Sequence, residues 1–150
     1  MQWNIGKPNT KQIAFFKART RFVAYGGARG GGKSWAVRKK SAGLALSYNG
    51  ISILILRRTF PELRENHILP MIADLNGDCA VSGHGQILHV SQWQPHRIWI
   101  LHSEADVLQY QGEEYDVIFM DEATQFTEFQ FTYARRHACA EPTTSQSAFI

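Results

Sequence analysis

The stretch that most constrains the fold of this chain is Gly27–Ser34, which reads GARGGGKS. It fits G-x-x-x-x-G-K-[ST] without a mismatch, a pattern in which glycines let successive backbone N–H groups surround phosphate oxygens. The lysine reaches the β- and γ-phosphates, and the hydroxyl binds Mg²⁺. The residues predicted to hold a nucleotide are therefore Gly27, Ala28, Arg29, Gly30, Gly31, Gly32, Lys33 and Ser34.

The segments on either side favour a phosphate-binding loop over a flexible linker, which is the other common use of a glycine-rich run. Residues 21–25 are rich in β-forming side chains and predict a buried strand. After the loop, one helical face is marked by Val37, Leu44, Ala45 and Tyr48. A loop between a strand and a helix places the positive end of the helix dipole at the anion site.

The rest of the chain alternates between strand and helix patterns. Residues 51–56 form an apolar run typical of a strand buried on both faces. Residues 59–75 predict a helix with a capping box of Thr59 and Glu62 and an interruption at Pro70. Three more strand signals are a hairpin around residues 84–85 and runs at 97–101 and 117–120. This order predicts an α/β fold with a largely parallel sheet.

Composition limits the classes of function. The 150 residues suit a single domain, and 44% of them are hydrophobic. No apolar run approaches the length of a membrane span, so no membrane partner is expected. Cys79 and Cys139 are isolated and the histidines lack zinc-ligand spacing, which favours free thiols and no zinc site. The net charge of +3 favours an acidic partner only weakly.

A second candidate site follows the predicted strand at 117–120, where Asp121 and Glu122 are adjacent. Open α/β sheets bind ligands at the carboxyl ends of their strands. There Asp121 would hold Mg²⁺ together with Ser34, and Glu122 would orient and deprotonate the attacking water. The alternative is an acidic strand end that caps the following helix. Beside a phosphate loop, the catalytic interpretation is favoured and indicates an ATPase.

Three segments together resemble the ATPase domain of a tailed-phage terminase large subunit: residues 26–34, 110–112 and 115–126, the last reading YDVIFMDEATQF. The resemblance runs from about Lys11 to about Tyr133. It implies a P-loop NTPase fold of the RecA-like, additional-strand (ASCE) class with helices flanking the sheet. It also implies ATP and Mg²⁺ as cofactors, double-stranded DNA, portal protein, procapsid and a small subunit as partners, a ring of copies in the full-length protein, and the host cytoplasm as location.

The same resemblance suggests roles for further residues. Gln12 would hydrogen-bond the adenine edge, although residues 11–16 also read as an amphipathic helix with aromatic core residues. Arg29 would act in catalysis by sensing the γ-phosphate or a neighbouring subunit, or would only balance charge. Arg57 and Arg58 would touch nucleotide or DNA, or simply be solvated.

The sequence also departs from the family pattern. We expect a partial ATPase domain at residues 1–136, incomplete at its C-terminal end, followed by a disordered or aberrant tail at 137–150. No coupling strand after Asp121 and no second acid cluster for a nuclease are evident in the sequence. The alternatives are therefore a truncated nucleotide-binding fragment without turnover, or another P-loop ATPase of helicase-like type.

Overall fold

A computed structural model describes residues 6–28, 30–75, 79–82, 87–90, 96–101, 115–137 and 146–149. The strands are β1 (Phe22–Ala24), β2 (Ser52–Leu56), β3 (Cys79–Ser82), β4 (Ile87–Val90), β5 (His96–Leu101), β6 (Val117–Met120) and β7 (Gln146–Phe149). The helices are α1 (Thr10–Lys17), α2 (Lys33–Ser47), α3 (Phe60–Leu63), the π-helical η1 (Arg64–Ile68), α4 (Leu69–Asp74), the 3₁₀ turn η2 (Ala123–Gln125) and α6 (Glu128–His137). None of these helices is long and apolar enough to cross a membrane.

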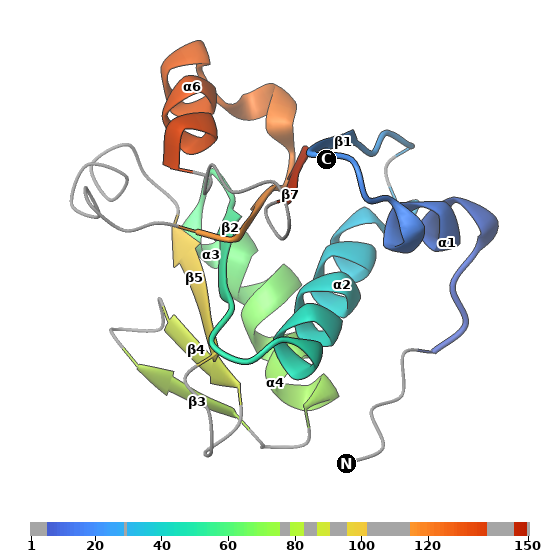
Figure 1. The fold of residues 1–150 in the computed structure, drawn as a ribbon, viewed down its shortest axis with the longest axis vertical. Coiled ribbons are helices and arrows are strands. Elements are labelled where there is room, and N and C mark those ends of the chain that lie inside the picture. The colour runs from blue at the N-terminus through green and yellow to red at the C-terminus, as the bar shows by residue number, and fades with distance from the viewer. Residues whose placement is uncertain are drawn as a thin grey trace.

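The described strands form one seven-stranded sheet in the order β1-β7-β6-β2-β5-β4-β3 (Figure 1). The five strands from β1 to β5 in this order pair in parallel, whereas β4 and β3 are antiparallel. This arrangement confirms the predicted α/β fold with a largely parallel sheet. It also confirms strands on both sides of the expected hairpin, whose turn at residues 83–86 lies outside the described residues.

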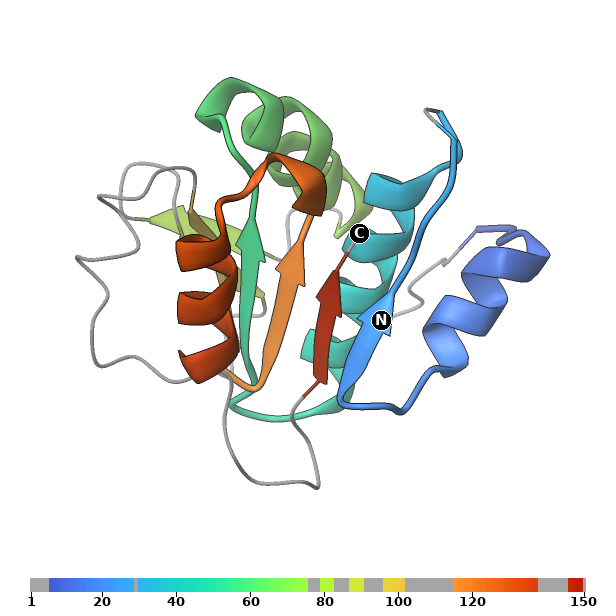
Figure 2. The same cartoon turned by 90° about the horizontal axis from the view of Figure 1, so that it is seen from above.

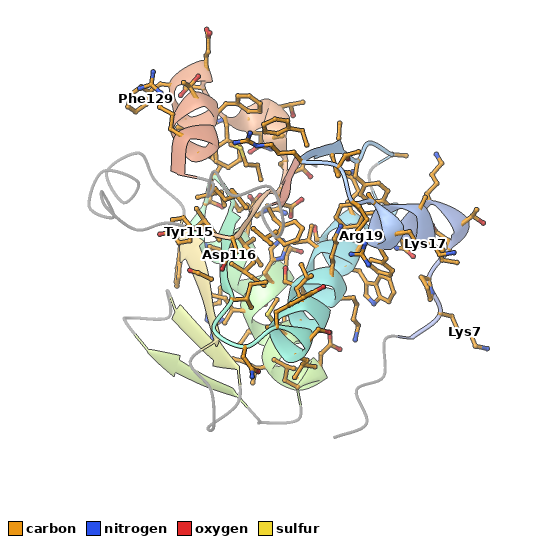
Figure 3. All side chains as sticks on the ribbon, viewed as in Figure 1. Lys7, Lys17, Arg19, Tyr115, Asp116 and Phe129 are labelled. Carbon is orange, nitrogen blue, oxygen red and sulfur yellow. The ribbon has the colours of Figure 1, made fainter. Side chains whose placement is uncertain are left out.

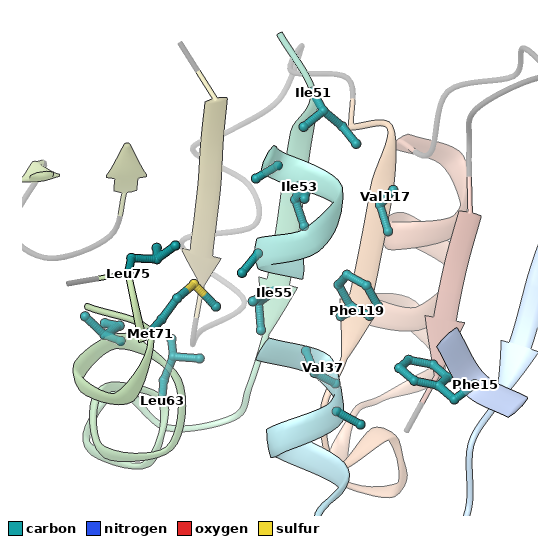
Figure 4. Close-up of a cluster of buried hydrophobic side chains, with 14 residues drawn as sticks. Phe15, Val37, Ile51, Ile53, Ile55, Leu63, Met71, Leu75, Val117 and Phe119 are labelled. Carbon is teal, nitrogen blue, oxygen red and sulfur yellow. The ribbon is translucent and has the colours of Figure 1, made fainter. Parts of the chain in front are cut away.

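The central strands β2 and β6 are buried on both faces. On one face, Ile53, Ile55 and Phe119 pack in a cluster that includes side chains of α1, α2, α3, η1 and α4 (Figure 4). On the other face, Leu54 and Met120 pack in a cluster that includes α6, which lies across the sheet from α2 (Figure 2). The apolar run at 51–56 is therefore a strand buried on both faces, as predicted, because its alternate residues face opposite helix layers.

The strand before the glycine-rich loop differs from its prediction. β1 forms an edge of the described sheet and its residues are exposed or half-buried, with Phe22 46% exposed. The prediction of a buried strand at 21–25 is therefore wrong. The apolar composition of a three-residue strand does not reveal whether it has a neighbour on each side.

The C-terminal segment also differs from expectation. Residues 146–149 form β7, which pairs in parallel with both β1 and β6 (Figure 2). These four residues of the expected tail therefore belong to the sheet, and the lack of the family's coupling motif stays a prediction. Residues 138–145 lie outside the described residues, and the domain boundary at residue 136 stays a prediction.

The helical segment at 60–74 is interrupted where Pro70 predicted it. Proline has no N–H, so the carbonyl of Asn66, four residues earlier, loses its helical donor. Arg38 of α2 donates to that carbonyl instead. The turn just before Pro70 is π-helical, with the Leu69 N–H bonded to the Arg64 carbonyl. Thr59 precedes the helix as its cap residue, but its side chain makes no cap hydrogen bond, so the predicted capping box is wrong.

Candidate functional site

The glycine-rich loop joins β1 to α2 and ends at the first turn of that helix. Gly30 and Gly32 have φ angles of 82° and 72°, in the left-handed region that glycine adopts without steric cost. Gly32 is the cap residue of α2, so the free N–H groups of the helix lie at the end of the loop. The described residues of the loop from Gly27 to Gly31 are exposed. The Gly31 N–H donates to the Ala28 carbonyl at 3.0 Å, so the free backbone donors that an anion site requires are those at the first turn of α2.

Lys33, the first residue of α2, folds back over the loop. Its Nζ donates to the carbonyl of Gly27 at 3.0 Å and to that of Ala28 at 3.3 Å. Both acceptors are neutral and lie in the exposed loop, so anionic phosphate oxygens are stronger partners for the ammonium. Arg29, within the same loop, lies outside the described residues.

Asp121 lies at the carboxyl end of β6, as predicted, and its side chain is fully buried. Its backbone N–H donates to the Leu56 carbonyl at 3.0 Å, which extends the pairing of β6 with β2 by one residue. The hydroxyl of Ser34 donates to Asp121 Oδ2 at 2.9 Å. The structure thus brings together the two predicted metal ligands, which are separated by 87 residues in the sequence.

Two further donors reach the same oxygen of Asp121. His67 Nε2 lies 2.7 Å from Oδ2, and an Arg57 guanidinium nitrogen is bonded to it as well. Arg57 is nearly buried and also pairs with Glu62 at 3.3 Å. The other carboxylate oxygen, Oδ1, is buried and has no hydrogen-bond partner among the described residues.

These contacts decide the ionisation of the cluster. Burial alone would raise the pKa of Asp121, but the hydrogen bonds from His67 and Ser34 and the charge of Arg57 outweigh it and lower the pKa to about 2. Burial lowers the pKa of His67, only partly opposed by Asp121. Asp121 is therefore a carboxylate at neutral pH, and since a carboxylate oxygen can only accept, His67 Nε2 is the donor of their hydrogen bond.

The residues at this position fit a hard divalent cation. Mg²⁺ prefers oxygen ligands and keeps several of its waters. An ionised carboxylate with one unpartnered buried oxygen, next to a serine hydroxyl, provides both a ligand and an acceptor for metal-bound water. Ser34 and Asp121 therefore have the donor set that the sequence analysis assigned to magnesium.

Glu122, the predicted base, occupies a strained position. It is the one non-glycine residue with positive φ in the described part of the chain, at φ 59° and ψ 51°. Left-handed backbone is unfavourable for residues with a Cβ, and such strain is concentrated at functional sites. The turn reverses the chain after β6 and leaves Glu122 half-buried next to Asp121.

Gln12 lies against the end of the loop, but its amide is already engaged. Nε2 donates to the Gly32 carbonyl at 3.2 Å, and Oε1 accepts from the backbone N–H of Asn9 at 2.8 Å. Together with the bond from the Gln12 N–H to Asn9, the second contact forms a capping box at the start of α1. The observed contacts connect α1 to the loop, and the adenine contact of Gln12 stays a prediction.

Sequence reasoning missed one residue of this cluster and misjudged another. His67 was not singled out, although a polar residue at i, i+4 spacing between apolar Leu63 and Met71 was a signal that could have found it. Arg57 is buried and pairs with Asp121, so the solvated alternative is wrong, and its contact with nucleotide or DNA stays a prediction. Arg58 is exposed.

No family model and no curated protein matches this sequence. Solved structures do match. The HK97 bacteriophage large terminase has a TM-score of 0.77 and 13% identity, over 97% of this chain and 33% of that one. The large terminase of a thermophilic bacteriophage has a TM-score of 0.73 and 17% identity, over 95% and 39%.

The ATPase domain of the Thermus phage P74-26 large terminase, solved alone, has a TM-score of 0.71 and 15% identity, over 95% of this chain and 64% of that domain. The chain thus spans about a third to two-fifths of the full-length terminases that it matches. At these identities the similarity establishes the fold. The chain has the P-loop, RecA-like fold of the ATPase domains of phage large terminases.

Proposed function

We propose that this chain is the ATP-binding and ATP-hydrolysing motor part of a phage large terminase, which drives double-stranded DNA into a procapsid. The observation that carries the proposal is the hydrogen bond from Ser34 to Asp121, which joins the glycine-rich loop to the acidic end of β6. It occurs in a fold shared with large terminase ATPase domains, and the thermophilic phage terminase has been solved with ADP and with ATP-γ-S.

In this proposal, the loop and the first turn of α2 hold the phosphates of ATP. Backbone N–H groups of the loop and of the first turn of α2 donate to phosphate oxygens, assisted by the helix dipole, and the Gly31 N–H exchanges the Ala28 carbonyl for a phosphate oxygen. Lys33 exchanges the carbonyls of Gly27 and Ala28 for the β- and γ-phosphates. The exchange replaces two neutral acceptors with charged ones, so it favours the bound state.

Ser34 and Asp121 would hold Mg²⁺, which neutralises charge on the β- and γ-phosphates when bound. Glu122, one residue further along, would accept a proton from the attacking water. Glu122 is half-buried and directly follows Asp121 at the carboxyl end of β6. Arg29 would stabilise the γ-phosphate from within the loop.

The partners proposed for the motor are double-stranded DNA, a portal protein on the procapsid, a terminase small subunit, and further copies of the chain in a ring. We assign no nuclease activity to these 150 residues, because the sequence offers no second acid cluster to hold two metals. Supercoiled plasmid incubated with the chain and Mg²⁺ or Mn²⁺ should stay uncut.

A second candidate is a nucleotide-binding fragment without turnover. It is favoured by the position of Glu122, because no contact within the described residues fixes its carboxylate against a water molecule. Phosphate release from Mg-ATP distinguishes the two candidate functions. It is measured with the chain alone and with added double-stranded DNA and procapsids. Release that stops in Lys33→Ala supports the motor, whereas tight Mg-ATP binding without release supports the fragment.

A further inference from the structure

His67 interrupts an otherwise apolar stripe. Leu63, Met71 and Leu75 are buried at four-residue spacing along the helical segment, and His67 falls between the first two. All four side chains are at most 1% exposed. An aliphatic residue would satisfy this environment without a desolvation cost, whereas a buried imidazole requires a hydrogen-bonding partner. The partner that the structure provides is Asp121.

The imidazole uses one nitrogen for this contact. Nε2 lies 2.7 Å from Asp121 Oδ2, and Nδ1 is buried without a partner among the described residues. Because a carboxylate oxygen can only accept a hydrogen bond, this contact requires a proton on Nε2. His67 therefore donates from Nε2 to the carboxylate of Asp121.

The three donors to Asp121 converge on Oδ2. Ser34, His67 and Arg57 come from α2, η1 and the end of β2, and none of them contacts Oδ1. Donors from three elements fix the rotation of the carboxylate about its side-chain bonds, so that Oδ1 keeps a single direction. A ligand atom that is held in one direction binds a metal with less loss of freedom.

We propose that His67 is a positioning residue that holds Asp121 with Oδ1 reserved for the magnesium shell. This inference rests on the proposed function, because it assigns a role only within a nucleotide site. Partners of ligand groups commonly change metal affinity 10- to 100-fold when they are removed. His67 thus tunes the affinity of the site for metal, and not the affinity of the loop for phosphate.

The π-helical segment that carries His67 also contacts α2. The wide turn changes the direction of its residues relative to a regular α-helix. Arg38 of α2 donates a hydrogen bond to the carbonyl of Asn66, the residue just before His67. Since α2 begins with Lys33 and Ser34, one helix contacts both the segment that carries His67 and the predicted phosphates. The metal and phosphate halves of the site are thus connected through α2.

The test compares Mg²⁺ dependence in the full 150-residue chain. ATP-γ-S binding is measured by calorimetry in EDTA and across a Mg²⁺ titration for wild type, His67→Leu and His67→Gln. We expect His67→Leu to raise the Mg²⁺ concentration for half-maximal effect about tenfold. His67→Gln, whose amide can donate from the place of Nε2, should stay within about twofold of wild type, and the affinity in EDTA should be the same in all three.

Met71→Leu is the matched control, because Met71 is fully buried on the same stripe and the substitution preserves volume. Its Mg²⁺ midpoint should equal that of wild type. An unchanged midpoint in His67→Leu, an equal shift in Met71→Leu, or a failure of His67→Gln to restore the midpoint would each refute the positioning role. A wild-type chain that binds no ATP-γ-S in either condition would instead refute the proposed function, and the role of His67 with it.

A second measurement does not depend on nucleotide. In the ¹⁵N NMR spectrum of the free chain, the His67 ring should carry a proton on Nε2, the nitrogen that contacts Asp121. An unprotonated Nε2 would mean that the ring does not donate to Asp121, and the inference would be wrong.

Discussion

Asp121 shows how a single carboxylate can be prepared for a metal. It is fully buried, yet its pKa lies at about 2 because donors from three elements and the charge of Arg57 outweigh the cost of burial. The carboxylate is therefore ionised across the physiological range. Removing one partner of such a cluster leaves the others unsatisfied, so the effects of substitutions at Ser34, Arg57 and His67 should not be additive.

Substitution of Glu122 should separate nucleotide binding from ATP hydrolysis. Glu122→Gln preserves the shape of the side chain but removes the basic oxygen, so nucleotide affinity should stay within about twofold while turnover falls at least about 100-fold. The measurement is phosphate release beside ATP binding. Glu128→Gln, at an exposed position at the start of α6, is the control and should leave both unchanged. Full turnover in Glu122→Gln would place the base elsewhere, and loss of binding would make Glu122 structural.

Lys40, which lies outside the candidate site, should make the free energy of unfolding depend on pH. Its Nζ donates to the Phe15 carbonyl at 3.0 Å, and burial, followed by the positive charge of Arg19 (Figure 3), lowers its pKa to about 8. Between pH 8 and about 10.5 the unfolded chain binds more protons here than the folded chain does, so the free energy of unfolding rises with pH, by at most about 3 kcal/mol. Urea unfolding should show this rise in wild type relative to Lys40→Met. Parallel pH profiles of the two proteins would contradict the shift.

Individual residues were predictable where a local pattern names them. Lys33 and Ser34 are given by the loop motif, and Asp121 by its place after an apolar strand. His67 lies 54 residues from Asp121, and its place in an apolar stripe marks it as unusual without indicating its partner. The contact depends on how the segment packs beside β6, which no local pattern encodes.

At the scale of elements, the glycine-rich loop is positioned from both ends. β1 leads into it, and Gln12 of α1 bonds the Gly32 carbonyl at its exit. Gly32 therefore needs glycine for its φ of 72°, and an added Cβ, which would lie 2.6 Å from Gln12 Nε2, would displace the end of the Gln12 side chain. The loop, α1 and α2 form one unit in which a small change at Gly32 affects all three.

Gly32→Ala should destabilise this unit. The left-handed backbone and the displacement of Gln12 should together lower the free energy of unfolding by about 1–2 kcal/mol and weaken ATP binding. Gly26→Ala is the control, because no atom lies within 4 Å of its added Cβ and its φ is not left-handed. Chemical denaturation measures both. Equal stability of the two variants would contradict the observed contact.

β7 is the element that sequence reasoning could not predict. Residues 137–150 are largely polar and contain a proline, so their composition indicates a tail. A parallel strand depends on distant partners, here β1 and β6, and its own four residues carry little signal. The strand signals at 51–56 and 117–120 were strong because those strands are buried on both faces.

Ala148→Pro tests this strand directly. With neighbours on both sides, each N–H of β7 meets a carbonyl, so proline removes a sheet hydrogen bond and should lower the free energy of unfolding by about 1–3 kcal/mol. Ala148→Val retains the N–H and serves as the control. If denaturation midpoints of wild type and Ala148→Pro coincide, the segment behaves as the tail that its composition indicates.

At the scale of the whole molecule, the strand order brings the two halves of the proposed site to the same edge of the sheet. β7 lies between the loop strand β1 and the acidic strand β6, and both β1 and β6 end at the same edge of the parallel sheet. The class of fold was predictable from alternating strand and helix patterns, but the strand order was not, because it depends on pairings across the whole chain. The two halves of the proposed site come from residues 27–34 and 121–122.

The central claim is that the loop and Asp121 form one Mg-ATP site. Its most direct test is calorimetric binding of ATP-γ-S with Mg²⁺ to wild type and Lys33→Ala. Lys33 is the cation that the motif directs at the phosphates, so wild type should bind and Lys33→Ala should lose at least about tenfold in affinity. Equal affinity of the two proteins would show that the loop does not hold the phosphates, and the account of this site would be wrong.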